Sequence, residues 1–305
     1  MPYSLLGRFQ GGLLGSKIAE RQAWQRLSST QPKAQQSLLS NWSEIQRCAT
    51  ESLIDCSCLD VANWCKRLQL VRPSLLALEG TASASETAIA IFPIALYFHD
   101  RQESLHRQVR EAAGLWLHPR EDATEVLAWA DAIAWIVKET RAGDRLLDGR
   151  LETLEARSTP LFKHLEQLRI LRDRALPLES VLDLSGSNRS LPSLTPLALA
   201  FYCFASTPED FELCVKRAAR APSAPQVATL TGALAGLYNC LCGIPPRWRA
   251  NLQDARANQQ QAQQLFAAWS GAYRPHRRFA RGPAIAAAGA LQPRASLKII
   301  SRSPG

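Results

Sequence analysis

The stretch 221-APSAPQVATLTGALAGLYNCLCGIPPRW-248 determines the expected fold. From Pro225 to Gly243 small and apolar residues follow helical spacing, and Gly243 with the two prolines beyond it ends the helix. So many small residues predict a helix that packs tightly against its neighbours. The turn before it, Ala221 to Gln226, is a natural place for ligand chemistry, yet it carries no charge.

The composition is that of a globular protein. The chain has 305 residues, of which 46% are hydrophobic and 21% charged, enough to bury a core. The longest apolar run, Ala88 to Phe98, is too short to span a bilayer and contains a proline. The N-terminal residues show no signal-peptide pattern. We therefore expect a cytoplasmic protein with no transmembrane segment.

Eight cysteines include two Cys-x-Cys pairs, one of them at Cys240 and Cys242 within the helical pattern. This spacing differs from the Cys-x2-Cys of zinc sites. In an intracellular chain we interpret the cysteines as reduced core thiols, and we predict no metal site built from them.

The net charge of +9 is concentrated at the C-terminus. Residues 271–305 contain seven basic residues and no acidic one, whereas the preceding residues hold 29 basic and 27 acidic side chains. We therefore divide the chain into a folded domain, residues 1–270, and a basic tail, residues 271–305. The tail either contacts an anionic partner or serves as a solvated extension.

Helical periodicity recurs along the chain, and alternating β-branched runs are absent, which predicts an all-α fold. In 206–220 we place the helix N-cap at Thr207, before a proline and two acidic residues. The Ser/Gly-rich residues 184–194 are expected to form a loop. The predicted helices are Glu121–Thr140, two within Arg145–Ala175 divided near Pro160, Ser206–Arg220, Pro225–Gly243 and Asn251–Gly271.

Four segments resemble the ADP-ribosylglycohydrolase family, in the family's order. Gly11 to Ala23 (GGLLGSKIAERQA) resembles its first glycine-rich helix, and Ala88 to Asp100 its apolar helix. Leu117 to Ala134 resembles its Thr-His-x-Asp-Pro helix, with His118 at the histidine. Gly232 to Trp248 resembles its last core helix and the Ile-Pro-x-x-Trp exit.

The resemblance implies an orthogonal all-α domain around a central cleft. Members of the family hydrolyse the bond between ADP-ribose and an acceptor such as arginine or serine. They use two divalent metals, usually Mg²⁺ or Mn²⁺, held by a Thr-Asp-Asp-Thr motif and a late Asp-Thr-Asp-Thr motif. Hard cations require such carboxylate oxygens.

The sequence departs from the family at both metal motifs. The first motif falls on Ser40-Asn41-Trp42-Ser43 and the second on Ser223-Ala224-Pro225-Gln226. The family's Gly-Asp in the first helix becomes Ala19-Glu20, which leaves one carboxylate. We therefore interpret the chain as a pseudoenzyme that binds a ligand or a protein partner, with no metal and no cofactor. Some relatives, the lens crystallins, are similarly non-enzymatic.

Alternatives remain open at this point. Glu20 is the one catalytic candidate, and an ADP-ribose-like nucleotide is the ligand that the resemblance favours. In an active Mg²⁺-dependent hydrolase, Glu20, Glu44 and Glu86 would supply oxygens from positions outside the motifs. For each of these residues, the alternative is an ordinary structural role with no part in binding or catalysis. The pocket candidates are Asn41, Trp42, Ser43, His118, Ser223 and Gln226.

Overall fold

The computed structural model describes residues 4–30, 41–121, 123–138, 169, 178–180, 194–252 and 254–272. These residues form helices and no strand, apart from an isolated bridge between Ala82 and Leu117, so the all-α prediction is confirmed. The helices are α1 (Leu5–Thr30), α2 (Asn41–Cys56), α3 (Val61–Val71), the 3-10 helix η1 (Pro73–Leu78), α4 (Ala84–Tyr97), α5 (Gln102–Trp116), α6 (Ala123–Lys138), α9 (Pro196–Ala205), α10 (Phe211–Ala218), α11 (Ala224–Gly243), α12 (Pro246–Ala250) and α13 (Ala255–Trp269).

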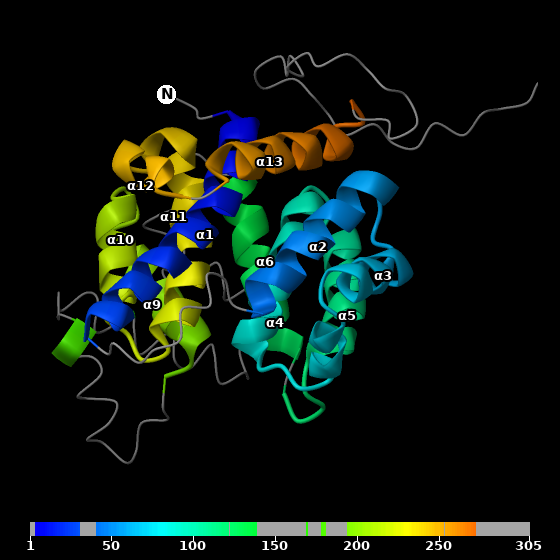
Figure 1. Cartoon of the computed structure of the whole chain (residues 1–305), viewed down its shortest axis with the longest axis horizontal. Helices are drawn as coiled ribbons and strands as arrows, with labels where there is room; N and C mark the ends of the chain where they lie inside the picture. Colours follow the sequence, from blue (N-terminus) through cyan, green and yellow to red (C-terminus); the bar gives the residue numbers. More distant parts are fainter. Residues whose placement is uncertain are drawn as a thin grey trace, which may run out of the picture.

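Helices α1 and α11 cross the domain as an antiparallel pair (Figure 1). A Cβ atom added to Gly11 would lie 2.1 Å from the carbonyl oxygen of Gly236. One added to Gly15 would lie 2.4 Å from the carbonyl oxygen of Gly232. Only glycine, which has no Cβ, permits two backbones to approach this closely. The tight packing expected of the small-residue helix is therefore confirmed, and its partner is α1.

Helix α4 lies inside the core. Every residue from Ala84 to Tyr97 except Glu86 is buried, and the helix packs against α2, α5, α6 and α11. A helix that is apolar on all sides is stable only when other helices surround it. A capping box holds its N-terminus, because Ser83 Oγ accepts from the Glu86 amide and Glu86 Oε2 accepts from the Ser83 amide. No helix within the described residues is long and apolar enough to cross a membrane.

The predicted N-cap at Thr207 is wrong. Helix α10 begins at Phe211, and Asp210 Oδ1 accepts a hydrogen bond from the Leu213 amide at 2.9 Å. The Thr207 hydroxyl is instead 3.0 Å from Arg217 Nη1, which donates to it. Of the two residues suited to the N-cap, Thr207 thus bonds to Arg217, and Asp210 caps the helix.

The cysteine prediction is only partly confirmed. All eight are free, but only half of them are buried in the core. Burial raises the pKa of Cys214 and of Cys240 to about 12, which keeps these thiols protonated and unreactive. The others lie near the end of α2, on α3 or in the last turn of α11, where less of the fold covers them. The buried four are Cys48, Cys203, Cys214 and Cys240.

Several predictions concern segments outside the described residues. These are the helices within Arg145–Ala175, of which only residue 169 is described, nearly all of the loop 184–194, and the tail beyond Ala272. The last described helix, α13, begins at Ala255 rather than at Asn251, because Asn251 is the C-cap of the short helix α12.

Candidate functional site

Glu20 is a buried carboxylate at the contact between α1 and α2. Its side chain has no solvent exposure, and Ser43 Oγ donates a hydrogen bond to Glu20 Oε2 at 2.5 Å. Ser43 itself is buried in the first turn of α2. A hydrogen bond of this kind offsets part of the cost of burying a polar group. The structure therefore brings together the catalytic candidate and one pocket candidate.

Trp42 points into the core beside this pair. The side chain is 7% exposed, and its ring meets that of Trp116 edge-on, with centroids 6.0 Å apart. Trp116 in turn lies 5.5 Å from the ring of Trp64. A tryptophan therefore packs, as part of an aromatic cluster, at a position where the resemblance expects a metal-binding aspartate. The neighbouring Asn41, the first residue of α2, is half-buried.

The uncharged turn before α11 is held by a residue from another helix. Gln226 Nε2 donates to Glu86 Oε1 at 3.2 Å, which connects the beginnings of α11 and α4. Ser223 is exposed and adopts left-handed backbone angles (φ 52°, ψ 41°) without making a side-chain cap. Of the two pocket candidates in this turn, only Gln226 is thus fixed by a described partner.

His118 belongs to a separate turn. It is half-buried, its Nδ1 accepts from the Arg120 amide at 3.1 Å, and its own amide donates to the Ala82 carbonyl at 2.8 Å. These bonds are those of a residue that closes the turn before α6. The described bonds of His118 thus connect it to Arg120 and to Ala82.

These residues do not fit a pair of hard cations. Glu20 accepts from Ser43, Glu44 pairs with Arg47 at 2.6 Å, and Glu86 closes the start of α4. Within the residues that the structure describes, no group of three or more His, Cys, Asp or Glu side chains could hold a metal ion. The three glutamates proposed for a rearranged metal site have separate partners instead of converging.

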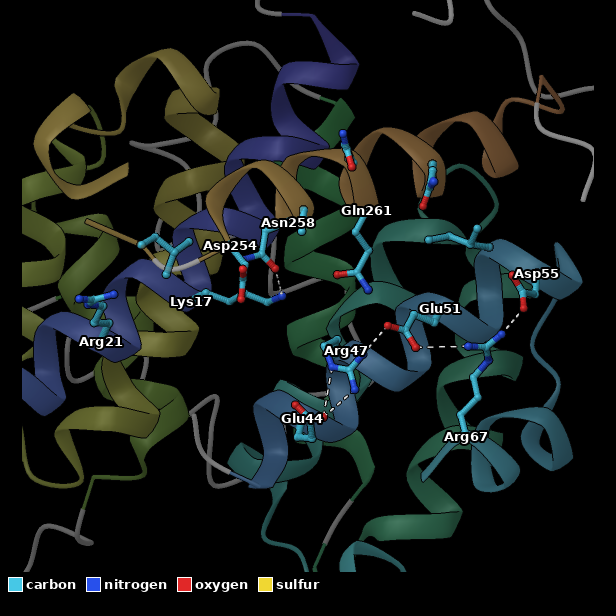
Figure 2. Close-up of a pocket in the computed structure, with 15 residues that line it drawn as sticks. Lys17, Arg21, Glu44, Arg47, Glu51, Asp55, Arg67, Asp254, Asn258 and Gln261 are labelled. Carbon is cyan, nitrogen blue, oxygen red and sulfur yellow. Dashed lines mark hydrogen bonds and ion pairs between the residues drawn. The ribbon is translucent and has the colours of Figure 1, made fainter. Parts of the chain in front are cut away.

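A polar cavity lies elsewhere, between α1, α2 and α13, and the sequence analysis did not identify it (Figure 2). Its volume is about 830 Å³, and none of the seven candidate residues lines it. The signals in the sequence were a lysine in a helix of small residues and the glutamine-rich face of α13. The lining is Lys17, Arg21, Glu44, Arg47, Glu51, Ile54, Asp55, Arg67, Leu252, Asp254, Ala257, Asn258, Gln260, Gln261 and Gln264.

Comparisons with known proteins define the class. The family model described as ADP-ribosylglycohydrolase matches residues 3–275, so the chain belongs to this family. A solved structure titled "ADP-ribosylglycohydrolase-related protein complex" is similar, with a TM-score of 0.62 and 18% sequence identity. The match covers 87% of this chain and 99% of that one, and at this identity it shows the fold alone. No curated protein matches the chain in sequence.

Proposed function

We propose that the protein is a non-hydrolytic member of the ADP-ribosylglycohydrolase family that binds a ligand or a protein partner. The observation that carries the proposal is that Asn41 and Trp42 stand at the carboxylate positions of the first metal motif, where Trp42 packs on Trp116. Ser223 and Pro225 stand at the carboxylate positions of the second motif. Without two bound cations, the family's polarised ribose and activated water are not available. Because one fold can host different functions, we assign this one a binding role.

The ligand that we propose is an ADP-ribose-like nucleotide. Asn41, Ser43, Ser223 and Gln226 carry amide or hydroxyl groups suited to hydrogen bonds with adenine or ribose. Ser43 and Gln226 already have carboxylate partners, which leaves Asn41 and the exposed Ser223 as the more accessible pair. Eight free cysteines fit the reducing cytoplasm as the setting.

The basic tail is a second element of the proposal. Residues 271–305 carry seven positive charges without an acid, and such a segment attracts anionic partners. Deletion of these residues should then weaken capture of an anionic partner and leave binding of ADP-ribose unchanged. If the deletion changes neither, the tail is only a solvated extension.

Calorimetric titration of the purified protein with ADP-ribose, in Mg²⁺ and in EDTA, tests the ligand. We expect the same affinity in both buffers, with weaker binding in the variant Ser223→Ala. Binding that requires Mg²⁺ would favour the active hydrolase, for which the retained, buried Glu20 is the supporting observation. Absence of binding in both buffers would leave the protein-partner form of the proposal, which pull-downs with and without the tail would then examine.

A further inference from the structure

The cavity between α1, α2 and α13 contains a buried cation without a counter-ion. Lys17 is 5% exposed, and its Nζ donates to Asn258 Oδ1 at 2.5 Å. That oxygen is neutral, and none of the ion pairs among the described residues includes Lys17. Burial lowers the pKa of Lys17 to about 8, against the weaker opposing effect of Glu44, Glu51 and Glu20. A buried charge of this kind is costly unless something pairs with it.

A second cation faces the same space. Arg47 of α2 lines the cavity, and its positive charge is the next largest cause of the lowered pKa of Lys17. The two cations therefore repel each other across the cavity (Figure 2).

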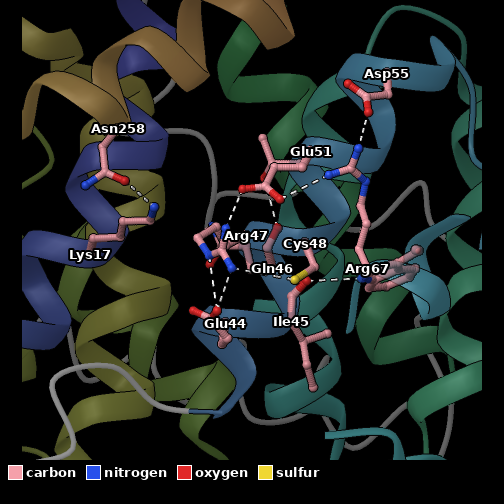
Figure 3. A network of polar contacts seen from close by, with 12 residues as sticks. Lys17, Glu44, Ile45, Gln46, Arg47, Cys48, Glu51, Asp55, Arg67 and Asn258 are labelled. Carbon is pink, nitrogen blue, oxygen red and sulfur yellow. Dashed lines mark hydrogen bonds and ion pairs between the residues drawn. The ribbon is translucent and has the colours of Figure 1, made fainter. Parts of the chain in front are cut away.

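Three of the four carboxylates that line the cavity are already engaged in ion pairs, and the fourth, Asp254, is not among the charges that raise the pKa of Lys17. Glu44 and Glu51 both pair with Arg47, and Arg67 pairs with Glu51 and with Asp55 (Figure 3). This network fixes the Arg47 guanidinium, but none of its carboxylates forms an ion pair with Lys17. Lys17 and Arg47 thus line a common cavity, and the two carboxylates that pair with Arg47 do not pair with Lys17.

We propose that this cavity binds the phosphate group of a polar small molecule between Lys17 and Arg47, with the Gln261 amide as a further donor. An anion at this place pairs with Lys17 and relieves its repulsion with Arg47. The donors come from three helices, and phosphate oxygens accept from several directions. The volume of about 830 Å³ exceeds what an inorganic ion requires, and the lining is polar, so the ligand is a phosphorylated molecule. The inference is independent of the proposed function, whose residues lie outside this cavity.

The test is calorimetric titration of the full chain with ribose 5-phosphate, inorganic phosphate and ribose, at pH 7 and low ionic strength. We expect ribose 5-phosphate to bind more tightly than inorganic phosphate, and ribose not to bind. Lys17→Met should weaken phosphate binding about 10- to 100-fold, the effect of losing a hydrogen bond to a charged group. The exposed Lys66 on α3 supplies the matched control, Lys66→Met, which should bind as the wild type does.

A second variant keeps Lys17 and supplies the missing counter-ion from the protein. Asn258→Asp places a carboxylate where the amide oxygen now accepts from Lys17, so it should compete with phosphate and also weaken binding at least 10-fold. Thermal melting checks that both variants are folded, and both should melt no lower than the wild type. The proposal is overturned if no phosphate compound binds, or if Lys17→Met binds within twofold of the wild type. Ribose 5-phosphate that binds no better than inorganic phosphate would overturn the assignment of a larger ligand.

Discussion

The close contact between α1 and α11 makes the fold sensitive to a single methyl group at Gly11. In Gly11→Ala the new Cβ would lie 2.1 Å from the Gly236 carbonyl oxygen and 2.7 Å from the Cys240 carbonyl carbon. Both atoms belong to the backbone, so no side chain can rotate away. The helices must separate, and every contact along the pair must adjust.

The expected change in the free energy of unfolding of Gly11→Ala follows from two opposing effects. Overpacking of a core costs about 1–3 kcal/mol and more where the backbone has to move, while alanine is favoured over glycine in a helix by about 0.5–1 kcal/mol. We therefore expect Gly11→Ala to lower the free energy of unfolding by about 2 kcal/mol or more. Urea unfolding followed by circular dichroism measures this difference.

Gly114 provides the matched control. It lies in α5, and a Cβ added there would have no atom within 4 Å. Gly114→Ala should therefore gain only the helical preference, about 0.5–1 kcal/mol. If both variants shifted stability in the same direction, or if Gly11→Ala matched the wild type, the close approach of α1 and α11 would be refuted.

Three further predictions concern side chains around the two sites. Lys17→Met should be more stable than the wild type at pH 7, because the pKa of Lys17 in the folded protein, about 8, lies below the ordinary 10.5. As the pH rises from 8 to 10.5, the wild type should regain up to about 3 kcal/mol of its free energy of unfolding. A difference between the two proteins in urea unfolding that does not change with pH would contradict this. Ser43→Ala removes a hydrogen bond to buried Glu20 and should cost about 1.5–3 kcal/mol by the same assay, whereas a neutral result would show that Ser43 does not support Glu20. Trp42→Ala should cost about 3–5 kcal/mol and lower the melting temperature, and an unchanged melting temperature would place Trp42 outside the core.

Much of the fold could be predicted from sequence because its central helices carry clear signals. The small residues of 225–243 predict close packing, and Gly243 with the prolines after it marks where α11 ends. The start of α10 could not be predicted, since Thr207 and Asp210 are both good caps. In the structure the Thr207 hydroxyl accepts from Arg217 and Asp210 caps the helix, and residue preference alone does not distinguish the two.

The site was less predictable, because its residues meet only where helices pack together. The sequence shows which carboxylates are missing, but it does not show that Ser43 would reach Glu20 or that Gln226 would reach Glu86. Nor does it show that Lys17 faces the α2 and α13 side of α1. Such contacts depend on the relative rotation of helices, which periodicity within one helix leaves open.

The central claim is that the family fold persists here without its hydrolytic chemistry, and release of ADP-ribose from modified substrates tests it most directly. The protein is incubated with ADP-ribosylated arginine and serine peptides, with Mg²⁺ and with EDTA, beside an active family member as positive control. We predict no release above the buffer background in either condition. Release that requires Mg²⁺ and that Glu20→Gln abolishes would contradict the account.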